Sequence, residues 1–351
     1  MTVVNFDQRM VNRRPPWEGL GTTFKERVSC SAALKDVGMD FNVIKAPMFI
    51  GVPTGVENKA KLRLWDKVAL IREPGNGGAD TDVFGTCSPK FEVVQRSSIA
   101  KCLDPLVSRW PLESIGYMDG GKTLFFLLNA GRMEIHKDPI NMYFMIVDML
   151  DGGTSLKSIF TTIRIKCTNA LLTSLKAAIV NMSINHRAGA TRALSFNTEA
   201  VGKMVNSQTS TVQAFEMMAR YKLTADETNR ILEYIYPKPK LSAKAGLVDY
   251  VPEGVEELAD IRQQGLTAVD TFDYYVNLSE QRRALALQLS TRFNDENPLL
   301  ANTAWSLYQG VTESADWRSG RGNVDADALF GTRATEKRNA FKAITAGMRG
   351  L

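Results

Sequence analysis

Histidine is scarce in this chain of 351 residues, and it has neither clustered cysteines nor a large excess of one charge. It has two histidines and four cysteines, and the cysteines form no CxxC pair. A structural zinc site needs such ligands at short spacing, so the sequence predicts neither a metal site nor a cofactor. We interpret the cysteines as reduced, mostly buried thiols of a cytoplasmic protein in a bacterial host cell.

Long apolar segments are also absent. No apolar run approaches the roughly 20 residues that a membrane span needs, and the first residues, MTVVNFDQRM, lack an apolar signal segment. We therefore expect no membrane partner. The content of 44% hydrophobic and 23% charged residues is ordinary for a globular protein, and the net charge of +5 excludes neither anionic nor neutral partners.

The distribution of proline, glycine and apolar residues divides the chain into three regions. Residues 1–60 are rich in proline and glycine and are predicted to form an irregular N-terminal arm, in which Trp17 would anchor the arm on the body. Residues 61–236 are predicted to form an α+β core that carries a nucleic-acid-binding sheet. Residues 237–351 are predicted to be a linker and a helical C-terminal region, with a mobile tail from Ser319.

The core has the clearest pattern. After a predicted helix at Ser97–Ser108 come runs of alternating or apolar residues that end at glycine-rich turns, which is typical of strands. The predicted strands are Leu112–Met118, Lys122–Asn129, Ile140–Leu150 and Ser155–Lys166. A helix is predicted to follow directly, from Cys167 to Met182, with its apolar residues on one face. The fold class is therefore α+β: an antiparallel sheet backed by a long helix (a β-β-β-β-α core), with a helical C-terminal region.

Helical periodicity predicts the elements of the C-terminal region. A capping box at Thr224 marks the start of one helix. The predicted helices are Thr211–Tyr221, Ala225–Tyr236, Ser279–Phe293 and Leu299–Ala315.

The segment from Gly116 to Thr123 (GYMDGGKT) satisfies the phosphate-loop pattern GxxxxGK[ST]. In such a loop backbone N–H groups surround the phosphates, the lysine reaches the outer phosphates, and the serine or threonine holds magnesium. Asp148, at the end of an apolar strand, could serve as the acid that also holds magnesium. A phosphate loop must stand between a buried strand and a helix, whereas Asp119-Gly-Gly is also a good hairpin turn. We interpret the match as coincidental and retain a phosphate-loop ATPase as the alternative.

The predicted strand Ser155–Lys166 places positively charged side chains on one of its faces. Thr162, Arg164 and Lys166 share one face because side chains alternate along a strand, and hydroxyls and cations both bind phosphate oxygens. A solvated face is an equally good explanation. The candidate nucleic-acid contacts are Lys157, Thr162, Arg164, Lys166, Arg187 and Arg192.

Aromatic residues lie close to these cations along the chain. Unpaired bases stack on exposed rings, and Tyr143 and Phe160 are the candidates for stacking, although core packing explains most of the neighbouring aromatics. No Ser-His-acid set or metal-ligand cluster can be placed, and His186 is interpreted as a structural or phosphate contact. The sequence therefore predicts no catalytic residues and a protein that is not an enzyme.

Three segments carry a resemblance to a known family. PPWEGLGT (15–22), VDMLDGGTSLKSIFTTIRIKCTNAL (147–171) and the blocks NTAW and VTE (302–305 and 311–313) resemble the signatures of a phage- and plasmid-encoded family whose domain has only an unknown-function label. The resemblance covers most of the chain. It implies a setting in phage or plasmid DNA metabolism by association and no defined chemistry.

The predicted order of elements is similar to the core of ring-forming, Redβ-type single-strand annealing proteins of phages. This likeness of topology implies a protein that binds and anneals single-stranded DNA as a homo-oligomer, either a ring or a filament. The alternatives are the ATPase that uses Gly116–Thr123, and a structural or host-interaction protein without nucleic-acid binding.

Overall fold

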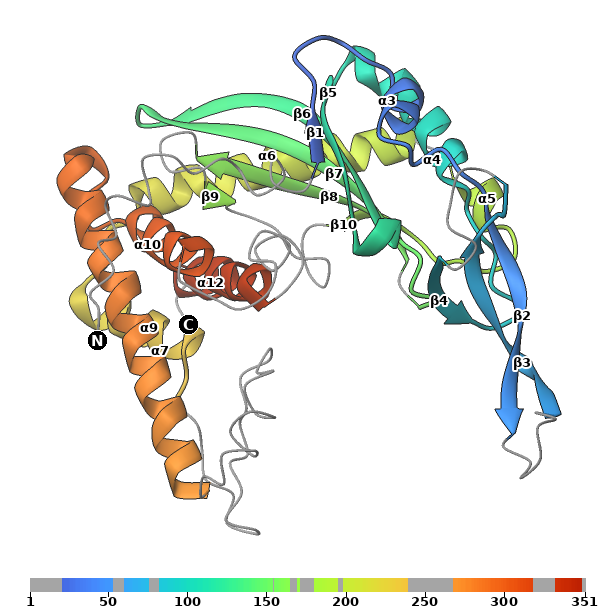
Figure 1. The fold of residues 1–351 in the computed structure, drawn as a ribbon. Coiled ribbons are helices and arrows are strands. Elements are labelled where there is room, and N and C mark those ends of the chain that lie inside the picture. Colours follow the sequence, from blue (N-terminus) through green and yellow to red (C-terminus); the bar gives the residue numbers. More distant parts are fainter. Residues whose placement is uncertain are drawn as a thin grey trace.

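The centre of the chain folds into one antiparallel sheet in a computed structural model (Figure 1). The model describes residues 21–52, 60–75, 82–153, 155–164, 169–170, 180–194, 198–238, 268–317 and 332–348. The strands pair in the order β1-β5-β6-β7-β8-β10, with β9 also beside β8. Their bounds are β1 Gly21–Thr23, β5 Leu112–Met118, β6 Thr123–Ile135, β7 Asp138–Met149, β8 Leu156–Arg164, β9 Asn169–Ala170 and β10 Val180–Ile184. The predicted α+β class and the predicted strands between residues 112 and 164 are confirmed.

A smaller sheet consists of β2 (Val43–Val52), β3 (Ala60–Arg72) and β4 (Val83–Cys87), in that order. The paired strands β2 and β3 project from one end of the molecule (Figure 1); we call this hairpin the β2–β3 arm. Together with β1 and helix α3 (Cys30–Asp36), it gives regular structure to much of the range 21–52, where the sequence led us to expect an irregular segment. Trp17 lies outside the described residues.

The long helix that backs the sheet is not the one that the sequence predicts. Between Cys167 and Met182, the described residues form β9 and the start of β10. The backing helix is α6, from Thr198 to Arg220, which contacts β6, β8 and β10 and follows the short helix α5 (Ala190–Ala193). Its helical pattern is recognisable in sequence only over its last half, because polar residues fill much of its first turns.

One hydrophobic core lies between the sheet, α6 and the helices at the top of Figure 1. These are α3 and α4 (Arg96–Leu103), the latter continued by the 3₁₀ turn η1 (Asp104–Ser108), as the predicted helix at Ser97–Ser108 indicates. Leu103 and Ile99 of α4 and Phe144 of β7 are buried in this core, and Trp110 packs on Phe144 with ring centroids 4.6 Å apart.

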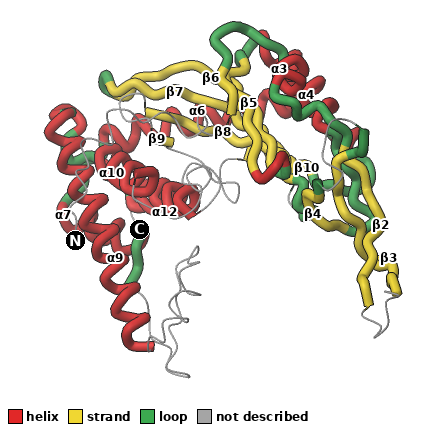
Figure 2. The backbone as a smooth tube through the Cα atoms, viewed as in Figure 1, coloured by secondary structure: helices red, strands yellow, loops and turns green. Residues whose placement is uncertain are grey.

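A second core joins the C-terminal helices to the tip of the β6–β7 hairpin. The helices, which gather at the end opposite the arm (Figure 2), are α7 Ala225–Ile235, α9 Ala268–Glu296, α10 Ala304–Trp317 and α12 Thr332–Gly347, with the 3₁₀ turn η3 Pro298–Leu300. Ile135 and Ile140 of the hairpin are buried here, and Trp305 Nε1 donates to Asp138 Oδ2 at 3.2 Å. The capping box at Thr224 is confirmed. The mobile tail predicted from Ser319 is wrong for residues 332–348, since Ile344 of α12 is fully buried in this core.

The central strands are buried on both faces. Consecutive residues of β6, from Leu124 to Leu128, and of β7, from Tyr143 to Val147, are all buried. Consecutive side chains of a strand point to opposite faces, so neither face of the sheet is open to solvent at this point.

Helices α9 and α10 pack so closely that a glycine is required between them. A Cβ atom on Gly310 would lie 2.4 Å from Ala286 O and 2.7 Å from Ser290 N, which are backbone atoms of α9. We expect Gly310→Ala to lower the free energy of unfolding by about 1–3 kcal/mol, since such overpacking forces backbone shifts. Gly202→Ala is the control: a Cβ there meets nothing within 4 Å, so it should stabilise α6 by about 0.5–1 kcal/mol. Urea unfolding of both variants checks this, and equal effects would contradict it.

Candidate nucleic-acid interface

The predicted nucleic-acid contacts do not form one exposed face among the described residues. Lys157 is half-buried, lies opposite Val147 of β7, and interacts with another group of the chain. Arg187, just after β10, is exposed. Thr162 and Arg164 lie on β8 opposite Met142 and Ile140, which are both buried. The side chains of Thr162, Arg164 and Arg192, and the whole of Lys166, lie outside the described part of the structure.

The predicted stacking residues are wrong. Tyr143 is 2% exposed and Phe160 is 1% exposed. Phe160 packs on Phe144 with ring centroids 5.3 Å apart, and the Tyr143 hydroxyl donates to Glu113 Oε1 at 2.9 Å. The continuous apolar runs of β6 and β7 contain the signal that these strands are buried on both faces, whereas the prediction of exposed rings assumed that buried and open faces alternate.

The segment that matches the phosphate-loop pattern lies on a hairpin. Asp119–Gly121 forms the 3₁₀ turn η2 between β5 and β6, and the residues after Lys122 enter β6 instead of a helix. Lys122–Asn129 is thus a strand from Thr123 onwards, as predicted. The strand-loop-helix setting of a phosphate loop is therefore missing, and the geometry gives the ATPase alternative no support.

Arg96, Asp148 and His186 form a buried polar cluster under this hairpin. Arg96 donates to the Gly121 carbonyl, and His186 Nε2 lies 3.6 Å from Asp148 Oδ1. His186 Nδ1 is 3.1 Å from Glu92 O, and its ring stacks on Phe91. The cluster thus ties β7, α4, the η2 turn and the segment after β10 together. We therefore interpret it as part of the architecture.

Burial controls the titration of this cluster. Desolvation raises the pKa of the Asp148 carboxyl, and the charges of Arg96 and His186 oppose the rise. Desolvation likewise lowers the pKa of Arg96 to about 10, with Asp148 opposing that change. Both carboxylate oxygens of Asp148 are buried and have no hydrogen-bond partner among the described residues, and this desolvation disfavours the charged form.

The β2–β3 arm carries the exposed aromatic side chains that the central sheet does not offer. Trp65 is 75% exposed and Phe49 is 54% exposed. Phe49 lies directly opposite Arg63 in the ladder, so the two share a face. The Arg63 guanidinium lies over the Trp65 ring, 4.3 Å from its centroid. We call Phe49, Arg63 and Trp65 the arm platform.

A break in the ladder explains why Trp65 is so exposed. Pro47 pairs with Val68 and the next residue, Met48, pairs with Leu64, so Trp65, Asp66 and Lys67 have no partner on β2. All three are exposed. The signal was present in sequence: in KLRLWDK (61–67), alternation puts lysine, arginine and tryptophan on one parity and the leucines on the other. This parity was not used to predict a binding face.

Exposed cations continue from the arm to its root. Lys45 Nζ donates to Pro89 O at 2.8 Å and to Phe91 O at 2.9 Å, which fixes the arm on the segment after β4. Lys90 is exposed in that segment. Glu92 N in turn donates to His186 O at 3.1 Å, so the exposed Arg187 is adjacent to the same junction.

Glu92 places an opposing charge at this junction. Its carboxylate accepts hydrogen bonds from Gly189 N at 2.6 Å and from Thr191 N at 2.9 Å. Hydrogen bonds from Thr191, and then from the Gly189 backbone, lower the pKa of Glu92 to about 2. It is therefore ionised at neutral pH and offsets part of the positive charge.

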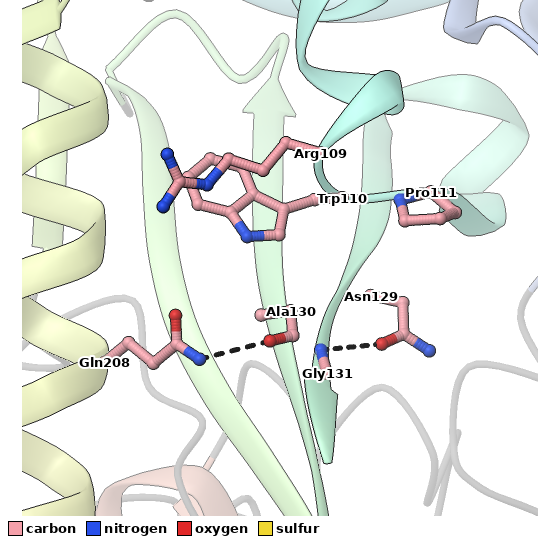
Figure 3. Close-up of a pocket in the computed structure, with 7 residues that line it drawn as sticks. All are labelled: Arg109, Trp110, Pro111, Asn129, Ala130, Gly131 and Gln208. Carbon is pink, nitrogen blue, oxygen red and sulfur yellow. Dashed lines mark hydrogen bonds between the residues drawn. The ribbon is translucent and has the colours of Figure 1, made fainter.

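A pocket of about 500 Å³ opens where β6 bulges (Figure 3). Asn129 pairs with Tyr143 and Gly131 with Met142, which leaves Ala130 without a partner on β7. The described lining residues are Arg109, Trp110, Pro111, Asn129, Ala130, Gly131 and Gln208.

The described residues contain neither a metal centre nor a membrane-spanning helix. No group of histidine, cysteine, aspartate and glutamate side chains there could hold a metal ion. None of the described helices combines the length and the apolar character that crossing a membrane requires.

The fold and the surface define a mixed α+β protein whose exposed aromatics and cations lie on a projecting arm. Comparison with protein families gives the more specific identification: a model described as "Domain of unknown function (DUF932)" matches residues 83–344, so the chain belongs to this family. The polar cluster and the pocket lie inside the matched range, whereas the β2–β3 arm precedes it. No curated protein and no solved structure matches the chain.

The raised pKa of Asp148 predicts a pH dependence of stability. A carboxyl whose folded-state pKa exceeds its unfolded value of about 4 stabilises the folded state most when protonated, and this contribution is lost as pH rises through the folded-state pKa. We therefore expect the free energy of unfolding of the wild type, minus that of Asp148→Asn, to fall as pH increases above about 4. Arg96 and His186 are present in both proteins. Urea titrations between acidic and neutral pH measure the difference, and a difference that grows with pH would show that Arg96 keeps Asp148 charged throughout.

Proposed function

We propose that this protein binds single-stranded DNA and anneals it. The observation that carries the proposal is the arm platform, an exposed tryptophan and an exposed phenylalanine on one face with an arginine between them. Bases in a single strand stack on exposed aromatic rings, and this stacking tolerates any sequence. The Arg63 guanidinium can contact the phosphate backbone while it stays over the Trp65 ring.

Charge supports the same partner. Between Val43 and Arg72 the chain has six lysine or arginine residues and two acids. Among those with described side chains, Lys45, Arg63 and Lys67 are exposed, and the exposed Arg187 extends the positive charge beyond the root of the arm. A duplex hides its base faces, so the platform favours unpaired strands.

Two substitutions separate stacking from charge. We expect Trp65→Ala to weaken binding of an oligonucleotide by about 1–3 kcal/mol, the worth of one stacked base, and to leave the salt dependence unchanged. Arg63→Ala should flatten the slope of log affinity against log salt by about 0.7 for each phosphate that the arginine neutralises in the wild type. Fluorescence anisotropy at several salt concentrations measures both effects.

The matched control for these variants is Tyr234→Ala, which removes an aromatic side chain that is 69% exposed on α7, far from the arm in Figure 1. It should bind as the wild type does. Equal losses of affinity in Trp65→Ala and Tyr234→Ala, or no loss in either, would overturn the assignment of the arm. Surface changes of this kind alter stability by less than about 0.5 kcal/mol, so folding should be retained.

The oligomer is part of the same proposal. Annealing brings two strands together, and copies of one binding arm gain avidity when several subunits hold one strand. We expect light scattering with an oligonucleotide long enough for several subunits to report a complex well above the protomer mass of 38.9 kDa. If each oligonucleotide bound a single protomer at all concentrations, the proposal of a ring or filament would be contradicted, whereas the proposal of DNA binding would not.

A further inference from the structure

The pocket at the β6 bulge has the dimensions of a small-molecule site. Its volume of about 500 Å³ lies within the range of about 300–1,000 Å³ that is usual for ligand pockets. Three separate segments build it: Arg109 to Pro111 after η1, Asn129 to Gly131 at the bulge, and Gln208 of α6. Bulges of this kind are common beside binding sites, because they re-aim the strand.

One wall of the pocket is formed by Arg109 and Trp110. The Arg109 guanidinium lies over the Trp110 ring, 5.0 Å from its centroid. Trp110 is itself buried against Phe144. Arg109 is exposed, and it is the one charged residue among the seven described residues that line the pocket (Figure 3).

The carboxamide of Gln208 is oriented by the bulge. Its Nε2 donates to the Ala130 carbonyl at 3.1 Å, which the bulge leaves without a partner on β7. The amide oxygen is therefore turned to the side on which the Arg109 guanidinium lies (Figure 3). The carboxamide of Asn129, in contrast, is occupied at both ends: it donates to Glu113 and accepts from Gly131 N at 2.8 Å.

The pocket thus presents a planar fork of donors and one acceptor oxygen beside an aromatic wall. We propose that it binds a guanine base. The arginine fork matches the acceptors O6 and N7 of guanine, and the Gln208 oxygen accepts from the donors N1–H and N2–H. Adenine has the N6 donor at the position where guanine has the O6 acceptor, so it cannot accept two hydrogen bonds from the Arg109 guanidinium. The base comes from a free guanosine nucleotide or from a bound strand, and the pocket can bind it whether or not the arm binds DNA.

Calorimetric titration with GMP tests the free source. We expect saturable binding, with AMP at least about tenfold weaker because adenine cannot form the bidentate pair with the arginine. Arg109→Lys should lose the preference for GMP, since lysine keeps the charge but not the fork. Arg230→Ala, which removes an exposed arginine of α7 outside this pocket, is the control and should bind GMP as the wild type does. Circular dichroism confirms folding of each variant.

Oligonucleotides test the strand source. An oligothymidylate with one dG should bind more tightly than oligothymidylate alone, and Arg109→Lys should remove that difference. Trp65→Ala should weaken both oligonucleotides equally, so failure of the pocket and failure of the arm are distinguishable. Guanine preference in either the nucleotide or the strand, abolished by Arg109→Lys, supports the site.

Three results would overturn the inference. The first is ribose 5-phosphate binding as tightly as GMP, which would mean attraction of phosphate to Arg109. The second is Arg109→Lys keeping the full preference for guanine. The third is no preference for guanine in either experiment.

Discussion

Burial of the central sheet on both faces is the constraint on which the location of any binding surface depends. The side chains of β6 and β7 alternate between two buried faces, and one of them packs against α6 and α4. A ligand as long as a nucleic acid strand cannot reach those rings without unfolding the core. Side chains that can contact such a ligand must therefore lie outside the central part of the sheet. The β2–β3 arm and the β6 bulge are two such places.

The arm is built to hold its platform away from the body without losing its orientation. Its root is fixed by the two hydrogen bonds of Lys45 and by the pairing of β3 with β4. Further out, the break in register leaves Trp65 outside the ladder, where its ring is held by Arg63 instead of by packing. An aromatic ring that is exposed but oriented loses little conformational entropy when a base stacks on it.

Most of the fold could be predicted from the sequence, because its signals are local. Glycine-rich turns and apolar runs predict β5 to β8, and the Thr224 capping box predicts the start of α7. The helix predicted at 167–182 failed because apolar spacing in a short segment does not separate a helix from strands that complete a sheet. The site was harder to predict. Whether Tyr143 and Phe160 are exposed depends on which faces of the sheet are covered by segments distant in sequence. The exposure of Trp65 beside Arg63 depends on a register break between β2 and β3 that composition does not reveal.

Photo-crosslinking tests the central claim most directly. An oligonucleotide with 5-bromodeoxyuridine is bound, irradiated and digested with trypsin, which cuts after Arg63 and Lys67 and releases Leu64–Lys67 as one peptide. If bases stack on the arm platform, this peptide should carry the main crosslink, through Trp65, and excess unlabelled single strand should remove that crosslink. Crosslinks confined to peptides of the C-terminal helices, with Leu64–Lys67 unmodified, would contradict the account.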